Sequence, residues 1–327
     1  MKEKLSDLCY KDIFDADLTL YAGNPVIKNF GFSFVAADPS LLTPDDSPTG
    51  QWHLFCHTFM GIYRLDSPDG AAFGKPHKIF GRAMRPNINA IDGRYYLFYE
   101  RTRTLLGNAL TLLGGKWKSE IYITQSCDLE HWTRPKPVIR QTRPFEKDEH
   151  GQMISNPFLI REGDIFKLYY SCGQTFIKDC GFTEPKYISY AKSERLEEDY
   201  VSRPEPIIKP DPNSEYFNLC SGCLKVYKLK DCYIGLQNGI FQREGKSHSA
   251  ILLLRSDDGD NFEFGKVLLS NRMQGDSDWM AQYVYASHLT LYKGELRLYF
   301  NARNTSNALK GREGIGFCYA KIDDKED

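Results

Sequence analysis

Residues 84–101, MRPNINAIDGRYYLFYER, consist of two apolar runs joined by a polar turn at Asp92-Gly93. An Asp-Gly pair between alternating apolar residues is a strong signal for a β-hairpin. The second run is rich in Tyr and Phe, which favour strands, and it ends in charged residues. This stretch therefore predicts two antiparallel strands with a polar end.

The same pattern returns along the chain, so that there are five copies in all. After most copies a further strand pair follows, marked by segments such as SEIYITQSCDLEHWT (119–133). The units start near residues 38, 85, 156, 222 and 287, a period of about 50 to 70 residues. Five four-stranded units with almost no helical periodicity predict an all-β fold, a single five-bladed β-propeller over residues 1–327. The other copies are ADPSLL with QWHLFCHTF (37–59), SNPFLIREGDIFKLYYSCG (155–173), CSGCLKVYKLKDCYIGLQNG (220–239) and YASHLTLYKGELRLYFNARN (285–304).

Two segments do not fit the repeat directly. The last unit lacks a clear fourth strand, and we expect DLTLYAGNPVI (17–27) to supply it and close the ring. LLGNALTLLGG (105–115) has helical character, and we interpret it as a loop insertion between strands. A pair of β-sandwiches is the alternative architecture, but it would not produce this repeated unit.

Composition narrows the class of function. The net charge of −1 gives no general attraction to nucleic acid or to an anionic membrane. The charged N-terminal segment lacks an export signal, and no run of about 18 apolar residues exists, so we expect a cytoplasmic protein. In that compartment the nine cysteines would be reduced thiols. The CSGC segment (220–223) alone is a weak metal signal, and no metal or other cofactor is predicted.

The polar residues at strand ends indicate a functional rim. In a propeller the first strand of each blade lies nearest the axis, so first-strand starts, second-strand ends and third-strand starts meet at one end of the ring. Asp38 stands out, because a carboxylate at the start of a first strand is where a central funnel needs a base; an Asx turn before Pro39 would explain it equally simply. The predicted rim carries Asp38, Arg85, Asn87, Asn156, Ser221 and Tyr285 from first strands, His57, Glu100, Gln237 and Arg303 from second strands, and Glu120 and Glu313 from third strands.

The segments NPVI (24–27) and ADPSLL (37–42), followed by an aromatic hairpin, resemble the opening of glycoside hydrolase family 43. YYLFYER (95–101) and IYITQSCDLEHWT (121–133) look like features of the successive blades of these enzymes. The resemblance implies a five-bladed, inverting glycosidase that acts on oligosaccharides, with Asp38 as general base. The family's third-blade aspartate falls at Asn156, and the fourth-blade glutamate, the general acid, falls at or near Ser221. Both are departures from the family pattern.

A serine cannot protonate a leaving group as a carboxylic acid does, so the acid must come from elsewhere. Inverting hydrolysis needs two carboxyl groups roughly 6.5–9.5 Å apart. Glu100 is the first candidate and Glu120 the second, although Glu100 could instead form a salt bridge with Arg85, Arg101 or Arg103. The predicted substrate-binding residues are His57, Arg85, Asn87, Asn156, Ser221, Gln237, Tyr285 and Arg303.

Two other functions stay open. Related propellers include glycoside phosphorylases, and Arg85, Arg101, Arg103 and Arg303 could hold a phosphate through bidentate contacts. The missing family carboxylates would also suit a sugar-binding propeller without catalytic activity. The sequence does not choose the sugar or the linkage.

Overall fold

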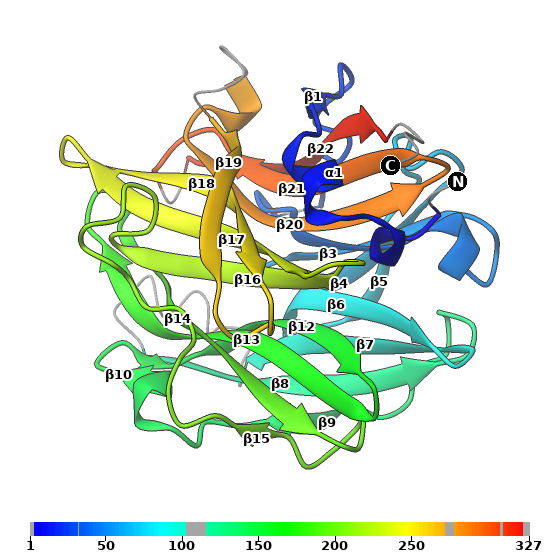
Figure 1. The fold of residues 1–327 in the computed structure, drawn as a ribbon, viewed down its shortest axis with the longest axis horizontal. Coiled ribbons are helices and arrows are strands. Elements are labelled where there is room, and N and C mark those ends of the chain that lie inside the picture. The colour runs from blue at the N-terminus through cyan, green and yellow to red at the C-terminus, as the bar shows by residue number, and fades with distance from the viewer. Residues whose placement is uncertain (1–2, 32, 103–115, 272–277, 308–309, 323–327) are drawn as a thin grey trace.

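The computed structural model describes residues 3–31, 33–102, 116–271, 278–307 and 310–322. Within them, five sheets stand around a common axis, as Figure 1 shows, and the four blade strands of each sheet are antiparallel. The prediction of an all-β, five-bladed propeller with four-stranded blades is confirmed. The segment interpreted as a helical loop insertion, residues 105–115, lies outside the described residues.

Each blade is a four-stranded meander that starts at the axis and runs outward. Blade I contains β2 (Ala37–Leu42), β3 (Trp52–Thr58), β4 (Gly61–Ser67) and β5 (His77–Phe80). Blade II contains β6 (Ala83–Ile91), β7 (Arg94–Thr102), β8 (Trp117–Ser126) and β9 (Lys136–Ile139). Blade III contains β12 (Ile154–Glu162), β13 (Ile165–Ile177), β14 (Phe182–Ser193) and β15 (Val201–Ser202). Blade IV contains β16 (Cys220–Lys228), β17 (Tyr233–Arg243), β18 (Lys246–Ser256) and β19 (Glu263–Ser270), and blade V contains β20 (Tyr283–Tyr292), β21 (Glu295–Arg303), β22 (Glu313–Lys321) and β1 (Thr19–Leu20).

The remaining elements are short. β10 (Lys147–Asp148) and β11 (Gly151–Gln152) extend blade II beside β8. One α-helix, α1 (Tyr10–Phe14), and four 3₁₀ turns, at Leu5–Asp7, Pro44–Asp46, Pro144–Glu146 and Asp278–Met280, complete the described chain. None of the helices in the described ranges is long and apolar enough to cross a membrane.

Both ends of the chain meet in blade V. β1 pairs antiparallel with β22, with Thr19 opposite Tyr319, and Figure 1 shows the two strands side by side. An isolated bridge between Ile27 and Ile315 adds a second tie. The N-terminal strand is only two residues long, shorter than DLTLYAGNPVI suggested, because the chain turns at Tyr21–Asn24. The short pairing still covers the otherwise open edge of β22.

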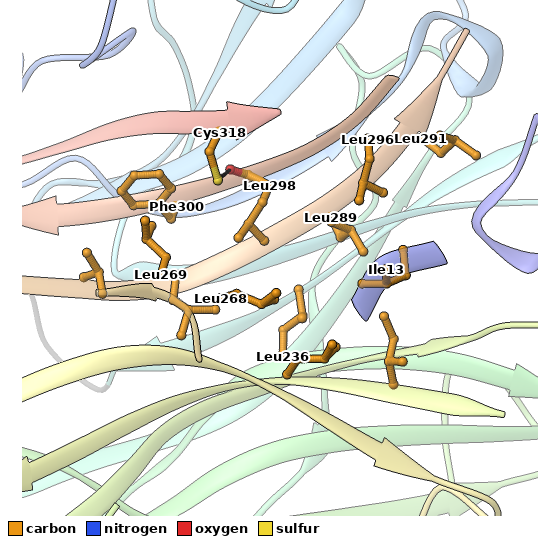
Figure 2. Packing of buried hydrophobic residues seen from close by; sticks show 14 of the residues in the cluster. Ile13, Leu236, Leu268, Leu269, Leu289, Leu291, Leu296, Leu298, Phe300 and Cys318 are labelled. Carbon is orange, nitrogen blue, oxygen red and sulfur yellow. Dashed lines mark hydrogen bonds between the residues drawn. The ribbon is translucent and has the colours of Figure 1, made fainter. Parts of the chain in front are cut away.

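The core is divided into wedges between neighbouring blades. Strand residues alternate between the two faces of each sheet, so each blade presents apolar side chains to both neighbours. Figure 2 shows the wedge between blades IV and V, where Leu236 and Leu268 pack with Leu289, Leu298 and Phe300. Equivalent buried clusters lie between blades V and I, I and II, II and III, and III and IV. Packing between blades therefore holds the five inner strands around the axis.

The outer turn between the third and fourth strands is built in the same way in three blades. A serine at the end of the third strand donates its hydroxyl hydrogen to an aspartate two residues later, and that aspartate accepts two backbone N–H groups. This is a compact Asx-type turn. The pairs are Ser67–Asp69, Ser126–Asp128 and Ser256–Asp258, with Oγ–Oδ1 distances of 2.9, 3.0 and 3.0 Å.

Candidate functional site

A funnel of about 510 Å³ opens at one end of the axis and is lined by residues from all five blades. Its floor is made by a β-bulge that interrupts every inner strand at the same level. A bulge places two residues opposite one on the neighbouring strand and turns a side chain out of the ladder. The first bulge residue of each blade lines the funnel, and these residues are Asp38, Arg85, Asn156, Gly222 and Tyr285.

Three of these bulge residues adopt a left-handed backbone. The φ angles of Asp38, Arg85 and Asn156 are 55°, 52° and 49°. Non-glycine residues enter this region at a cost, and such conformations cluster at functional sites. Each of the three precedes a proline. The bulges thus aim a carboxylate, a guanidinium and an amide into one space.

Asp38 is held from two sides. Its Oδ2 lies 3.3 Å from His57 Nδ1, and its backbone N–H donates to Asn301 Oδ1 at 3.2 Å. Burial lowers the pKa of His57 to about 4, although Asp38 opposes this shift, so the imidazole is neutral at pH 7. The side chain of Asp38 is 13% exposed, which leaves it open to the funnel. This is the geometry of a carboxylate that can accept a proton from a bound molecule.

Glu184, on β14, is a second carboxyl group in the funnel. It is half-buried, and no described residue donates a hydrogen bond to its carboxyl group. Burial raises the pKa of Glu184 to about 8; Arg85 opposes the shift, while Glu313 and Asp38 add to it. The side chain is therefore mostly protonated at pH 7, so it can donate a proton.

Glu313 is the third carboxyl group, and it belongs to a polar network at the base of blade V. It accepts a hydrogen bond from Arg303 Nη1 at 2.7 Å and one from Asn301 Nδ2 at 3.3 Å. Burial raises the pKa of Glu313, Arg303 partly opposes the shift, and Asp38 adds to it. Because Asn301 Oδ1 also accepts from the backbone N–H of Asp38, one amide side chain connects the Glu313 carboxyl group to the backbone of Asp38.

Of the eleven predicted catalytic and substrate-binding residues, six line the funnel and five do not; Glu313, which was predicted only for the rim, lines it as well. The six all come from bulges or from the ends of second strands. Those outside have their polar groups satisfied within or between blades; Asn87 Oδ1, for example, accepts from the backbone of Leu159 at 3.0 Å, and Ser221 contacts Gln237 at 2.6 Å. The funnel contains Asp38, His57, Arg85, Asn156, Tyr285 and Arg303, whereas Glu100, Glu120, Asn87, Ser221 and Gln237 are not part of its lining.

The positions of Glu100 and Glu120 do not support the prediction that they are catalytic. The Glu100 side chain is fully buried, forms an ion pair with Arg85 and accepts from Trp117 Nε1 at 2.9 Å. Glu100 thus forms a salt bridge, which was the alternative to a catalytic role, and its partner is Arg85. Glu120 Oε2 lies 3.7 Å from Arg140 Nε, and the Glu120 side chain lines a separate groove on blade II.

Sequence reasoning missed Glu184, and in blade IV it chose Ser221, which does not line the funnel. The sequence analysis named no third-strand residue of blade III, whereas β14 starts at Phe182 and carries Glu184 into the funnel. In blade IV the residue equivalent to Asp38 is Gly222, one position after Ser221. The Asp-Pro, Arg-Pro and Asn-Pro dipeptides of blades I to III were the signal for the bulges, and blade IV lacks it.

Aromatic side chains also line the funnel. Phe34 and Phe59 form an edge-to-face pair on blade I, with ring centroids 5.0 Å apart. The rings of Phe176 and His150 stack on one another, with centroids 6.3 Å apart. Aromatic faces of this kind pack on the apolar faces of sugar rings. In the described part of the chain, no group of three or more His, Cys, Asp or Glu residues is arranged to hold a metal ion.

Neither a family model nor a curated protein matches the sequence. Solved structures do match. An N-acetylgalactosamine deacetylase from F. plautii, in complex with blood group B trisaccharide, aligns with a TM-score of 0.67 and 13% identity over 93% of this chain and 96% of that one. A xylan β-1,4-xylosidase from Bacillus halodurans aligns with a TM-score of 0.60 and 17% identity over 93% of this chain and 55% of that one.

A third match is a member of the GH130 family, described as mannoside phosphorylases that include glycoside hydrolases for β-1,2 mannosidic linkages in Candida mannan. It has a TM-score of 0.62 and 14% identity over 97% of this chain and 96% of that one. At these identities the similarity shows the fold, because one fold hosts many activities. The family resemblance stated from the sequence is confirmed to that extent: this chain is a five-bladed β-propeller that matches glycosidases and phosphorylases structurally at low identity.

Proposed function

We propose that the protein is a glycosidase that cleaves terminal glycosidic bonds of oligosaccharides with inversion, using Asp38 as general base and Glu184 as general acid. The observation that carries the proposal is the pair of carboxyl groups in one funnel, of which Glu184 has a pKa raised to about 8. Inverting hydrolysis requires one carboxyl group that is protonated and one that is ionised. The structural similarity to glycosidases adds support.

In this proposal Glu184 protonates the oxygen of the leaving group. Asp38 accepts a proton from the attacking water. The neutral imidazole of His57, whose Nδ1 accepts from the backbone N–H of Arg85 at 3.4 Å, packs against the Asp38 carboxylate without adding a charge. Glu184 starts neutral and ends ionised while Asp38 does the reverse, so the net charge of the funnel is unchanged. Asn156 and Tyr285 line the funnel beside these groups and would bind sugar hydroxyls.

Glu184 replaces Glu100 as the proposed acid. Both carboxylate oxygens of Glu100 are occupied, one by Arg85 and the other by Trp117, and the side chain has no exposed surface. An acid must reach the proton acceptor within hydrogen-bond distance in a plausible substrate pose. Glu184 lines the funnel and has no competing donor among the described residues.

A phosphorylase is the second candidate. Arg85 and Arg303 both line the funnel, and one structural match belongs to a family of mannoside phosphorylases. Against this, Arg85 is paired with Glu100 and Arg303 with Glu313, so neither guanidinium is fully available for a phosphate. Arg101 lies in the separate groove on blade II, and Arg103 lies outside the described residues.

A release assay tests the proposal. The purified protein is incubated with nitrophenyl glycosides and short oligosaccharides, with and without inorganic phosphate, beside Asp38→Asn, Glu184→Gln and the control Glu120→Gln. Turnover without phosphate that is lost in the first two variants and retained in the control is the expected result, and ¹H NMR of the first-formed anomer reports inversion. Turnover only with phosphate would establish the phosphorylase instead. Sugar binding without turnover would make the protein a sugar-binding propeller.

We also propose that the substrate is a small oligosaccharide processed in the cytoplasm. Each of the nine cysteines is a free thiol, and seven of them are buried, which suits a reducing compartment. Cell fractionation with an antibody against the protein tests this part.

A further inference from the structure

One hairpin of the propeller is longer than its counterparts and reaches over the funnel. β13 and β14 of blade III have 13 and 12 residues, whereas the corresponding β3 and β4 of blade I have 7 each. The added length, residues 172–187, is called the arm below. It stays paired to its end, with Thr175 opposite Glu184 and Ile177 opposite Phe182. The arm contributes Gln174, Phe176, Thr183 and Glu184 to the funnel.

The tip of the arm is a tight turn. Backbone N–H groups of Cys180 and Gly181 both donate to the carbonyl of Ile177, at 3.2 and 2.9 Å. Gly181 has φ of 74°, a conformation that glycine adopts without strain. The turn directs Asp179 and Cys180 away from blade III, toward the starts of β18 and β20.

At that point the arm is hydrogen-bonded to two other blades. Asp179 Oδ2 accepts from the backbone N–H and the hydroxyl of Ser247, at 2.9 and 2.8 Å. The Ser247 Oγ lies 2.5 Å from the Tyr283 hydroxyl, which lies 2.5 Å from Cys180 Sγ. Cys180 Sγ also lies 3.2 Å from Ser247 Oγ, which closes the cycle. Blades III, IV and V therefore meet in one four-residue network.

The network is shielded from water. Ser247, Tyr283 and Cys180 are 1%, 2% and 6% exposed, and only Asp179 reaches the surface. A small apolar cluster that includes Ile177, Ile240 and Tyr283 packs beneath it. Hydrogen bonds in such surroundings compete little with solvent, and breaking one leaves a buried polar group unsatisfied.

We propose that Asp179, Cys180, Ser247 and Tyr283 form a lock that fastens the arm across blades IV and V and so positions Glu184 in the funnel. The four are positioning residues, since none of them lines the funnel or would touch substrate. The assignment of Glu184 as the acid rests on the proposed function; the lock itself rests on the contacts alone.

The arm needs such a lock because Glu184 has no fixing contact of its own. No described residue donates a hydrogen bond to its carboxyl group, so its place is set by β14 and by whatever holds the arm down. If the tip came free, the half-buried carboxyl group would become more exposed to water and its pKa would fall from about 8 toward its ordinary value. The acid would then be ionised at neutral pH and displaced from the leaving group.

The first experiment needs no substrate. Hydrogen exchange is measured in the arm peptides of the wild type, Ser247→Ala and Tyr283→Phe, with Ser256→Ala as the control. Ser256 stands at the other end of the same strand and makes an equivalent serine–aspartate hydrogen bond, but lies far from the arm along β18. Exchange at least tenfold faster in residues 172–187, in the first two variants only, is the expected result. Unchanged exchange there would overturn the lock.

The second experiment measures the pKa of Glu184 directly. The ¹³C carboxyl signal of Glu184, assigned by its absence in Glu184→Gln, is titrated in the wild type and in Ser247→Ala. We expect the midpoint to move from about 8 to a lower pH in Ser247→Ala and to stay in Ser256→Ala. A midpoint that does not move would refute positioning. If no glycoside is turned over, these two readouts still decide the lock, so its failure is distinguishable from failure of the proposed function.

The third experiment measures turnover. Misplacing a catalytic group by about 1 Å costs about a hundredfold in rate, so Cys180→Ala and Ser247→Ala should lower kcat by about ten- to a hundredfold with little change in KM. The alkaline limb of the pH–rate profile should move to lower pH. Cys180→Ser keeps a hydrogen-bonding group and should restore most of the loss. Equal kcat in Cys180→Ala and the wild type would contradict the proposal.

Discussion

Glu100 lies near the end of β7, a second strand, and Glu184 lies near the start of β14, a third strand. Both positions are at the same end of the ring, yet the two carboxyl groups differ in charge and in partners. Glu100 has a guanidinium on one oxygen and an indole N–H on the other, and it is sealed from water. Glu184 faces the funnel without a described donor, near two other carboxyl groups. A buried carboxylate that is paired stays ionised and is costly to disrupt, whereas one that is desolvated and unpaired keeps its proton. The comparison teaches that partners decide the role of a carboxyl group more than its place on a strand.

The largest expected effect that separates the two is loss of activity in Glu184→Gln. Without a general acid, kcat should fall by about 10²- to 10⁴-fold on oligosaccharides, because the leaving group must depart unprotonated. The loss should be smaller on nitrophenyl glycosides, whose leaving group needs little protonation. Steady-state kinetics on both substrate types measure it, and equal losses on the two types would speak against an acid role.

Glu100→Gln should chiefly reduce stability. The change removes the charge that compensates Arg85, and breaking one side of a buried ion pair costs about 3–5 kcal/mol. Urea unfolding of the wild type and variant gives the difference in the free energy of unfolding. Trp117→Phe removes the indole N–H that contacts Glu100 and Ser119 and makes the ring smaller, but it leaves the ion pair in place, so it is the milder variant and should cost about 1–3 kcal/mol. A stable Glu100→Gln protein would show that Arg85 finds another partner.

The free energy of unfolding should depend on pH through Glu184, which should stabilise the fold at low pH and not at high pH. Its pKa is raised from an ordinary value of about 4.3 to about 8 in the folded protein, so the folded state binds more protons between these values. The stability from this group is complete below about pH 4 and is lost as the pH rises through 8. Glu184→Gln should therefore gain stability relative to the wild type on going from pH 5 to pH 8. Thermal unfolding at both pH values checks the sign, and a constant difference would disprove the shift.

The smallest effect is expected for Glu120→Gln. Glu120 lies outside the funnel and makes a single long contact with an exposed Arg140. Exposed ion pairs contribute about 0–1 kcal/mol, so stability should change by no more than that and kcat should stay the same. A marked loss of turnover would show that Glu120 is catalytic after all, and it would contradict the assignment of Glu184 as the acid.

Several site residues were predictable because their position follows from local strand order. Asp38, Arg85 and Asn156 begin first strands, and each is followed by a proline, which cannot donate to the ladder and favours a bulge. His57 and Arg303 end second strands, so they reach the same level of the ring.

The other site residues were not predictable from strand order. A bulge adds one residue without a sequence mark in blade IV, which moved the funnel position from Ser221 to Gly222. Glu184 lies on the arm, whose tip contacts Ser247 and Tyr283 some 70 to 100 positions further along the chain. No periodicity within blade III contains that information.

The sequence by itself determined the five blades, since the alternation of apolar residues and the turn residues act over a few neighbouring positions. It also determined which blades would bring charged groups to the axis. Only the tertiary structure decided the proton states and partners of those groups. Arg85 pairs with Glu100 across the hairpin of blade II, which is one of the salt bridges that the sequence left open. Glu184 of blade III is desolvated and interacts with Asp38 and Glu313 because ring closure brings strands from different blades to one funnel. Burial and Coulomb interactions depend on the distances between these groups, and a linear sequence does not contain them.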